Sequence, residues 1–306
     1  MSIFGGIIAL QDSSQETDEW DISNCSLNNP TKTMYQKPNK RLLDQTVIVT
    51  GANSGLGKAV AESLGREGAN VVVNYISNPE AAEEIAHGIC EDELCGRGIA
   101  IKADVSKEDQ VIRMFKEAVD TFGTVDVLVA NAGLQRDYPL HEMPLEEWQL
   151  VIDVNLTGHF LCAREAIREF LRRGMRPEVS CALGKIVHMS SVHEIIPWAG
   201  HANYAASKSG LVMLMKTIAQ AYGPQKIRAN SIAPGAIQTP INREAWENPE
   251  ALEKLNELIP YKRIGQPSDI GAAAAWLASD ESDYINGSTI FIDGAMTCYP
   301  GFTENG

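Results

Sequence analysis

Seven short runs of apolar and β-branched residues recur along the chain, and longer stretches with helical periodicity separate them. Their residues show little polar alternation, which is typical of strands buried on both faces of a parallel sheet. Right-handed crossovers between such strands give an α/β fold. We therefore predict a single-domain doubly wound parallel sheet (a Rossmann fold), with helices on both faces and about seven strands, at 46–50, 70–75, 98–102, 126–130, 185–190, 228–233 and 288–293.

The composition limits the functions open to the chain. It has 306 residues and a net charge of −14, which argues against non-specific binding of nucleic acid and of anionic membranes. The six cysteines are scattered and suggest neither a disulfide framework nor a metal site. The apolar stretch 3–10 is too short to span a bilayer, and it has no signal-peptide pattern, so we expect a cytoplasmic protein.

The first part of the chain differs from the rest. Residues 1–40 are rich in Asp, Glu, Ser, Asn and Thr and show neither helical nor strand periodicity. Few aliphatic side chains are present to offset the entropy of ordering. We predict a flexible N-terminal extension at 1–40 and a Rossmann-type domain at 41–306.

A glycine-rich turn follows the first predicted strand. The sequence TGANSGLG covers 50–57 and opens a predicted helix. Glycines allow close approach of the backbone to a pyrophosphate, and the N–H groups of a helix start favour the phosphate charge. We expect this turn to bind a dinucleotide through Gly51, Asn53, Ser54, Gly55, Leu56 and Gly57.

Further polar and small residues follow other strands at the same edge of the sheet. Asp104 and Val105 follow the third strand, where they suit an adenine ring, and Asn131, Ala132 and Gly133 follow the fourth. The second strand ends near Asn74, which we expect to contact the cofactor at the place where an acidic residue would bind the ribose. No acidic residue there repels a 2′-phosphate, and no arginine attracts one. We predict that the protein accepts both NAD and NADP.

The stretch 190–210 carries the candidate chemistry. Tyr204 and Lys208 are four residues apart on a predicted helix and share a face. A free tyrosine has a pKa of about 10, and we expect the ammonium and an oxidised nicotinamide to lower it by roughly one to three units each. Ser191, at the end of the preceding strand, suits the substrate oxygen. Asn155 suits a water molecule that links the lysine to solvent.

This set resembles the Asn-Ser-Tyr-Lys tetrad of the short-chain dehydrogenase/reductase family, together with TGANSGLG, NAG and YAASK, over residues 42 to about 300. The resemblance implies an oxidoreductase of CH–OH groups in which Tyr204 and Lys208 also contact the cofactor. It implies a homotetramer, a small-molecule substrate and a lid over that substrate at about 238–262. It further implies that the turn PGAIQT holds the nicotinamide through Pro234, Gly235, Ile237 and Thr239.

Within the family, MSSVHEIIPW and NSIAPGAIQTPIN are similar to bacterial glucose 1-dehydrogenases. This likeness implies oxidation of β-D-glucose to glucono-1,5-lactone. A sugar needs polar partners for its hydroxyls. We expect them to be Ser191, Tyr204, His193, Gln135 and Asn242, with Trp198 as a weaker candidate for the pocket wall.

Two alternatives remain open. The first is a 3-oxoacyl-acyl-carrier-protein reductase, or another carbonyl reductase of the family, which would need a basic face for an acidic carrier. Arginines between 164 and 176 would supply that face. The remote alternative is a nucleotide-sensing protein without catalysis, which has no need of the Tyr204–Lys208 pair.

Overall fold

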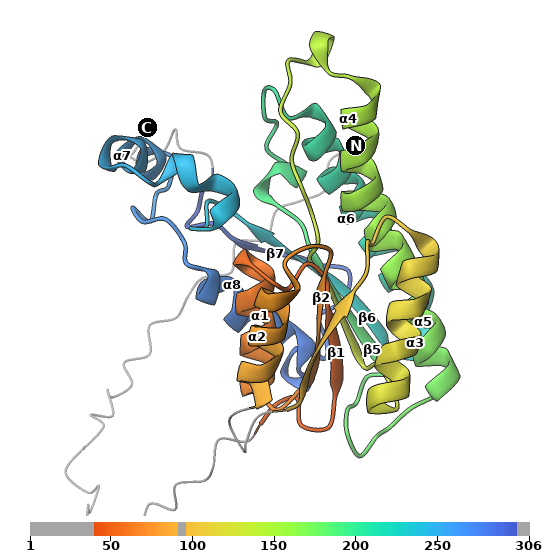
Figure 1. The fold of residues 1–306 in the computed structure, drawn as a ribbon. Helices are drawn as coiled ribbons and strands as arrows, with labels where there is room; N and C mark the ends of the chain where they lie inside the picture. The colour runs from red at the N-terminus through yellow and green to blue at the C-terminus, as the bar shows by residue number, and fades with distance from the viewer. Residues whose placement is uncertain (1–39, 91–95, 299–306) are drawn as a thin grey trace, which may run out of the picture. The chain divides into compact units, whose positions relative to one another are not determined.

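The computed structural model describes residues 40–90 and 96–298, so nearly all of the extension predicted at 1–40 lies outside the described residues. Seven strands form one sheet in the order β3-β2-β1-β4-β5-β6-β7, and every neighbouring pair is parallel. The predicted fold class and all seven predicted strands are confirmed (Figure 1). The strands are β1 (Thr46–Val49), β2 (Asn70–Tyr75), β3 (Gly98–Lys102), β4 (Val127–Ala130), β5 (Gly184–Met189), β6 (Ile227–Pro234) and β7 (Thr289–Ile292).

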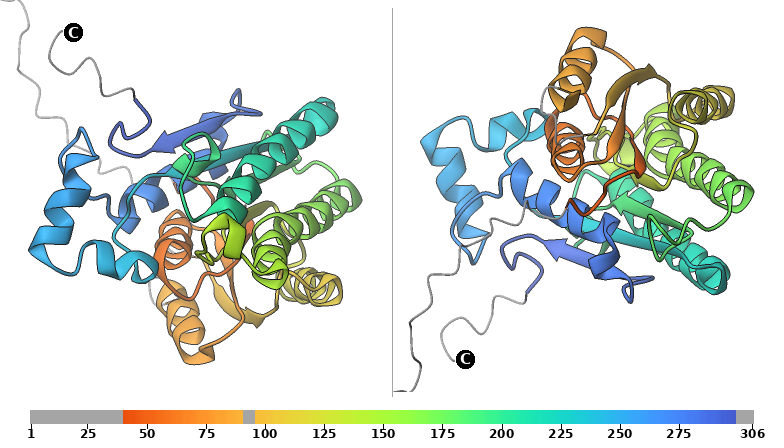
Figure 2. Two further views of the ribbon diagram at one scale, coloured as in Figure 1. Left: turned by 90° about the horizontal axis from the view of Figure 1, so that it is seen from above. Right: turned by 90° about the horizontal axis from the view of Figure 1, so that it is seen from below.

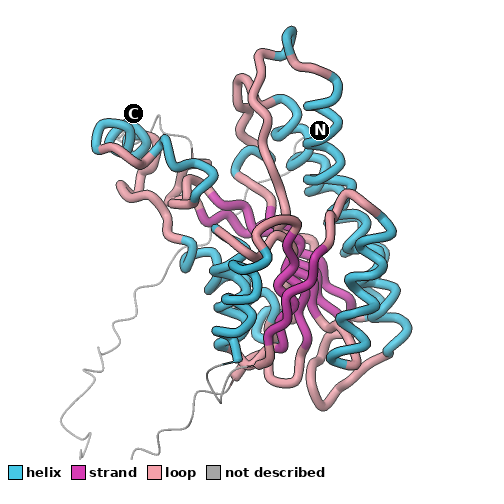
Figure 3. The backbone as a smooth tube through the Cα atoms, viewed as in Figure 1, coloured by secondary structure: helices cyan, strands magenta, loops and turns pink. Residues whose placement is uncertain are grey.

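Helices connect the strands and cover both faces of the sheet, as Figures 2 and 3 show. The α-helices are α1 (Gly55–Arg66), α2 (Pro79–Cys90), α3 (Glu108–Phe122), α4 (Leu145–Ile152), α5 (Gly158–Arg173), α6 (Ala202–Tyr222), α7 (Pro249–Glu257) and α8 (Pro267–Ala278). Among the described residues, none of these helices is both long and apolar enough to cross a membrane.

Alternate residues of each strand face two separate cores, because successive side chains of a strand point to opposite faces. In β1, Val47 and Val49 pack with α1, α2 and α8. The residue between them, Ile48, packs with α3, α5 and α6. Both faces are therefore apolar, which explains why the strand sequences show no polar alternation.

The order of the strands places the candidate site. The chain runs outward from β1 through β2 to β3, then returns to the other side of β1 for β4 to β7. A crevice forms at such a reversal, beyond the carboxyl ends of the strands. The glycine-rich turn after β1 and the NAG turn after β4 both lie at this point.

The long helix expected at 145–173 is not regular. A π-helical turn, Asp153–Thr157, separates α4 from α5, and the N–H of Gly158 bonds to the carbonyl of Asp153. Turns of this kind often mark functional sites. The helical period of the sequence gives no signal for one inserted residue, so the prediction missed it.

The segment expected to be a lid, about 238–262, contains a 3₁₀ helix, Pro240–Ala245, and α7. Neither helix contains a fully buried residue. Figure 1 shows α7 beyond the carboxyl ends of the strands, across from the loops that join β4 to α4 and β5 to α6. Few buried contacts favour local opening, which suits a segment that covers a substrate.

Candidate active site

The turn after β1 brings the backbone close to the start of α1. Gly51 and Gly55 have φ angles of 60° and 53°, in the left-handed region that favours glycine. A Cβ on Gly57 would lie 2.2 Å from the carbonyl oxygen of Gly51. The N-cap residue Ser54 makes no side-chain capping bond within the described part of the chain. The first N–H groups of α1 are thus suited to phosphate oxygens.

Two asparagines hold this turn in place. The Asn74 oxygen accepts from the N–H of Gly51 at 3.1 Å, while its amide donates to the carbonyls of Ile101 and Ala103. The Asn131 amide donates to the carbonyls of Thr50 and Gly51 at 2.9 and 3.1 Å. Asn74 was predicted to meet the ribose, but these bonds occupy its amide, so it supports the turn.

A cavity of about 440 Å³ begins at the glycine turn and extends to the candidate catalytic helix. Most of the predicted cofactor residues line it. They are Gly51, Asn53, Ser54, Gly55, Leu56, Gly57, Asn74, Asp104, Val105, Asn131, Ala132, Gly133, Tyr204, Lys208 and Thr239. The sequence analysis missed other lining residues, chiefly apolar ones whose pattern looks like ordinary core, namely Ile76, Ala103, Leu134, Val154, Met189, Pro240 and Ile241.

Three predicted cofactor residues do not line the cavity. Pro234 ends β6, and Gly235 lies against Asp293 and Met296 of the C-terminal segment. Ile237 is buried and forms an isolated parallel bridge with Gly265. These residues shape the turn that brings Thr239 to the cavity.

Tyr204 and Lys208 line the cavity, whereas Ser191 does not line it but lies beside the Tyr204 hydroxyl. The Lys208 Nζ lies 5.6 Å from the centre of the Tyr204 ring and donates to the carbonyl of Met189 at 2.7 Å. Burial lowers the pKa of Lys208 to about 8, and the carboxylate of Glu194 opposes this shift. A lysine that titrates near neutrality suits proton transfer.

The pKa of Tyr204 differs in direction from the prediction. Burial raises it, and hydrogen bonding to Ser191 and Gln135 opposes that shift without overcoming it. The predicted decrease depended on neighbouring cations, but burial disfavours the phenolate charge more strongly within the protein itself. The Tyr204 hydroxyl nevertheless lies beside Ser191 and Gln135, and both side chains can orient it towards a substrate oxygen.

Asn155 lies in the π-helical turn and is fully buried. Its oxygen accepts from the N–H of Leu134 at 2.8 Å, and its amide donates to the Leu134 carbonyl and the Ser207 hydroxyl. We predicted that this side chain fixes a water, but the bonds engage it with protein. It positions the segment after the NAG turn against α6.

A stack of aromatic rings stands beside Tyr204. The Trp198 ring stacks on His193 at 4.2 Å and on His201 at 3.5 Å between ring centres. Trp198 and His193 each lie 6.4 Å from Tyr204, edge to face. An ion pair of 3.1 Å joins His201 to Asp137. The predicted substrate residues His193 and Trp198 therefore form one aromatic wall beside Tyr204, but neither is among the residues that line the cavity.

Asn242, predicted to contact substrate, is not brought to the cavity. Its oxygen accepts from the hydroxyl and the N–H of Thr239, at 2.9 and 3.1 Å. The same oxygen accepts from the indole N–H of Trp246 at 3.2 Å. These bonds make Asn242 the anchor of the first turn of the 3₁₀ helix Pro240–Ala245.

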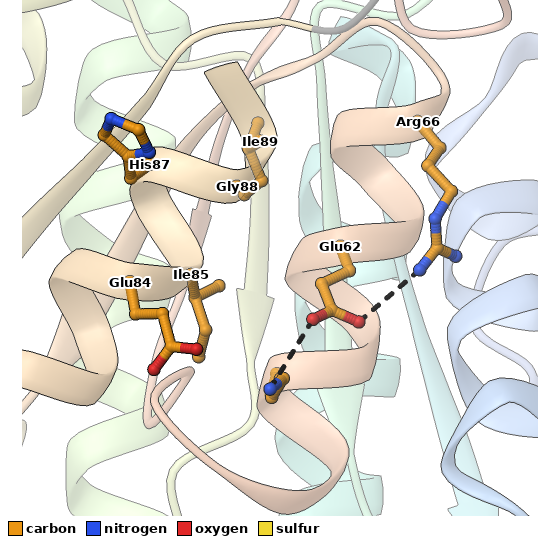
Figure 4. A pocket seen from close by; sticks show the side chains of 8 residues that line it. Glu62, Arg66, Glu84, Ile85, His87, Gly88 and Ile89 are labelled. Atoms are coloured by element: carbon orange, nitrogen blue, oxygen red, sulfur yellow. Dashed lines mark hydrogen bonds and ion pairs between the residues drawn. The ribbon is translucent and has the colours of Figure 1, made fainter. Parts of the chain in front are cut away.

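A second cavity of about 510 Å³ lies between α1 and α2 (Figure 4). Glu62 forms ion pairs there with Lys58 and Arg66, at 3.8 and 3.4 Å. None of the predicted site residues lines this cavity. Lys58, which follows the glycine turn, therefore faces this groove and not the dinucleotide cavity.

Fold and site together define a Rossmann-fold oxidoreductase, with a dinucleotide cavity lined by Tyr204 and Lys208 and with Ser191 beside the tyrosine. A family model described as enoyl-(acyl carrier protein) reductase matches residues 51–297. The chain belongs to the short-chain dehydrogenase/reductase family, whose members act on alcohol and carbonyl groups with NAD(P).

Curated relatives cover nearly the whole domain. The chain is 50% identical over 261 residues to 3beta-hydroxysteroid dehydrogenase 1 of Eggerthella lenta, which covers 85% of this chain and 97% of the relative. It is 42% identical over 266 residues to glucose 1-dehydrogenase 2 of Bacillus subtilis, covering 87% and 99%. A solved gluconate 5-dehydrogenase of Burkholderia cenocepacia, in complex with NADP and tartrate, matches with a TM-score of 0.77 and 32% identity, covering 85% and 98%.

Proposed function

We propose that the protein oxidises a secondary hydroxyl on a ring-shaped substrate and transfers the hydride to NAD or NADP. The observation that carries this proposal is that Tyr204 and Lys208 line the dinucleotide cavity and that Ser191 lies beside the Tyr204 hydroxyl. The bound nicotinamide supplies the hydride acceptor. The residues of the chain supply orientation and proton transfer.

Tyr204 acts as the general base in the oxidation. Its oxygen takes the proton of the substrate hydroxyl, while the hydroxyl of Ser191 holds the same substrate oxygen. Gln135 also interacts with the Tyr204 phenol and restricts the positions that the substrate oxygen can take. Lys208 stabilises the phenolate by its charge, since its ammonium is held next to the ring by Met189.

Use of both cofactors remains our proposal, and the end of β2 supports it. Asn74 is occupied by backbone groups, and the residue exposed to the cavity is Ile76, with 57% of its surface accessible. An uncharged side chain neither repels the 2′-phosphate of NADP nor binds it.

Glucose remains the first candidate substrate. The support is the identity of 42% to a glucose 1-dehydrogenase and the polar groups of Gln135 and His193 near Tyr204. The Nδ1 of His193 interacts with the carbonyl of Ile196, which fixes the ring orientation. Oxidation at the anomeric carbon would give glucono-1,5-lactone.

A second candidate, a 3β-hydroxysteroid, is favoured by apolar residues at and near the cavity. Ile241 lines it and is 66% exposed, and Trp198, in the wall beside Tyr204, is 39% exposed. With Asn242 engaged elsewhere, fewer polar partners remain for a sugar. The identity of 50% to a 3β-hydroxysteroid dehydrogenase points the same way.

The test is a panel of glucose and 3β-hydroxysteroids assayed with each cofactor by the absorbance of the reduced nicotinamide. We expect turnover of at least one substrate, and a loss of about 10²-fold or more in kcat for Tyr204→Phe. Tyr222→Phe, at the other end of α6 from Tyr204, is the matched control and should retain activity. Full turnover by Tyr204→Phe would refute the assignment of the base.

The alternatives are weaker. The arginines proposed as a docking face for an acyl carrier are all in ion pairs, for example Arg164 with Glu108 at 2.6 Å and Arg172 with Glu169 at 2.6 Å. Assaying an acetoacetyl thioester beside glucose separates these functions.

A purely nucleotide-sensing protein would show cofactor binding without turnover of any substrate. We keep a homotetramer and a cytoplasmic location as proposals, to be tested by sedimentation and by fractionation.

A further inference from the structure

A cluster of buried polar side chains beneath α6 has no role in the proposed function. Of its members, only Ser190 also lines the dinucleotide cavity. Each has at least one buried nitrogen or oxygen atom without a hydrogen-bond partner among the described residues. They are His188, Ser190, Glu194, Ser231 and Thr289.

Strand register brings three of these residues together. His188 of β5 is paired with Ser231 of β6, and Ser231 is paired with Thr289 of β7. Their side chains share one face of the sheet, because neighbouring residues in register point the same way. Ile186 and Ala229, two residues before His188 and Ser231, pack in the core that includes α5 and α6. The row therefore faces α6.

Glu194 closes this row from the turn Val192–Glu194. Its N–H donates to the carbonyl of Ser191, and its own carbonyl accepts from the Ser209 hydroxyl of α6 at 2.9 Å. The residue is 9% exposed. The hydroxyls of Ser190 and Thr289 influence its carboxyl but do not reach good hydrogen-bond geometry. Burial raises the pKa of Glu194, against the opposing influence of Ser190, Thr289, Lys216 and Lys208.

Lys208 is connected to this cluster through the end of β5. Its Nζ donates to the carbonyl of Met189, and the next residue is Ser190, whose hydroxyl lies near the Glu194 carboxyl. Glu194 raises the pKa of Lys208, and Lys208 lowers that of Glu194. The Glu194 carboxyl and the Lys208 ammonium therefore interact electrostatically in the protein interior.

The hydrogen bonds of His159 and His188, on the other side of the cluster, fix which ring nitrogens donate and which accept. The Nε2 of His159 donates to the carbonyl of Ala132 at 3.0 Å, so its Nδ1 accepts from the Nδ1 of His188 at 3.2 Å. The remaining Nε2 of His188 is then an acceptor with no donor among the described residues. Buried polar atoms of this kind are usually satisfied by ordered water.

We propose that Glu194 exchanges a proton with Lys208 inside the protein and acts on the reaction through this lysine. Ordered water among Ser190, His188 and Ser231 connects the carboxyl to the ammonium. In the forward step an N–H bond of the ammonium breaks and an O–H bond forms on the carboxylate. Both groups become neutral, and the reverse step restores them. No oxidant or other reactant is needed. This inference rests on the proposed function of Lys208.

The groups that act on the Glu194 carboxyl are Ser190 after β5, Thr289 from β7, and Lys216 and Lys208 from α6. Both lysines favour the carboxylate, while burial favours the neutral acid. His188 stays neutral, because burial first and Lys208 second lower its pKa to about 3. The proton therefore has two sites in this cluster, Glu194 and Lys208.

The test compares Glu194→Gln with Ser209→Ala by the pH dependence of kcat. Loss of the carboxylate lowers the pKa of Lys208, so the limb of the profile due to Lys208 should move to lower pH by on the order of one unit. KM should change less than about twofold. Ser209→Ala removes the bond to the Glu194 backbone and leaves the carboxyl, so its profile should match wild type. An unmoved limb in Glu194→Gln, or an equal shift in Ser209→Ala, would overturn the inference.

A second variant and a second measurement keep the result interpretable. Thr289→Val preserves shape, lies away from the dinucleotide cavity and removes one hydroxyl that favours the carboxylate. The infrared absorption of the protonated Glu194 carboxyl, taken as the difference between the spectra with and without Glu194→Gln and followed against pH, should shift to a higher midpoint in Thr289→Val. This readout needs no turnover. An absent carboxyl signal in wild type at every pH refutes the inference alone, whereas inactivity of wild type on every substrate refutes only the proposed function.

Discussion

At the end of β2 a single uncharged side chain occupies the place where cofactor choice is expected. Ile76 is exposed and lines the dinucleotide cavity, whereas Asn74, which the sequence suggested, is turned to the backbone. Position along the strand decides this difference, since Asn74 lies further inward and is buried under the glycine turn. We therefore expect the side chain of residue 76 to influence binding of the 2′-phosphate of NADP more directly than Asn74 does.

We expect Ile76→Arg to raise kcat/KM for NADP relative to NAD by about tenfold, because a guanidinium binds the phosphate with paired hydrogen bonds. The measurement is the ratio of kcat/KM for the two cofactors. Ile112→Arg adds the same charge on α3, where the residue is 43% exposed, and serves as the control. An unchanged ratio in Ile76→Arg would show that the ribose end lies elsewhere.

At the scale of elements, the start of α1 depends on the absence of a side chain. A Cβ on Gly57 would lie 2.2 Å from the Gly51 carbonyl and 2.6 Å from the Asn131 amide. Gly88, near the end of α2, has no atom within 4 Å of the corresponding position. The two glycines are matched in chemistry and opposite in surroundings.

We expect Gly57→Ala to destabilise the fold by about 1–3 kcal/mol and to weaken cofactor binding at least tenfold. Gly88→Ala should be neutral, or stabilise by up to about 1 kcal/mol through helix propensity. Urea unfolding and fluorescence titration with reduced cofactor measure both quantities. Equal behaviour of the two variants would argue against close packing at the glycine turn.

The π-helical turn makes a second prediction about an element. Asn155→Ala leaves the buried N–H of Leu134 without its partner and should cost about 2–4 kcal/mol in the free energy of unfolding. Asn53→Ala, at an exposed bond in the glycine turn, is the comparison and should cost much less. If Asn155→Ala lost activity with full stability, its role would be chemical and not positional.

At the scale of the whole domain, a network at the far end of the sheet joins distant segments. Lys185 of β5 is 2% exposed and donates to Gln45, just before β1, at 2.9 Å. It also pairs with Asp280 at 2.8 Å, and Asp280 accepts from Ser180 and from the N–H of Cys181. Burial alone would raise the pKa of Asp280, but hydrogen bonds from Lys185, Ser180 and Cys181 lower it to about 2.

A carboxyl whose folded pKa lies below its unfolded value of about 3.9 stabilises the protein above that pH. The contribution is lost as the pH falls from about 4 towards 2. We expect Asp280→Asn to lower Tm at pH 7 and to reduce the dependence of Tm on pH in this range. Asp109→Asn, which removes an exposed ion pair with Arg113, should change Tm little. An unaltered acid dependence in Asp280→Asn would contradict this assignment.

The sequence by itself determined the architecture and the candidate reacting groups. The strand and helix periods, the glycines after 46–50 and the spacing of Tyr204 and Lys208 are local patterns, and each depends only on residues a few positions apart. The structure confirmed every predicted strand and placed most of the predicted cofactor residues at one cavity.

Only the tertiary structure decided how individual polar groups are used. Asn74 and Asn155 bond to segments distant in sequence, burial reverses the predicted pKa shift of Tyr204, and β5 brings Lys208 near Glu194. Each of these features depends on which polar groups are buried next to one another and on which hydrogen-bond donors they find there. That exclusion is a property of packing between elements, and no local pattern in the sequence encodes it.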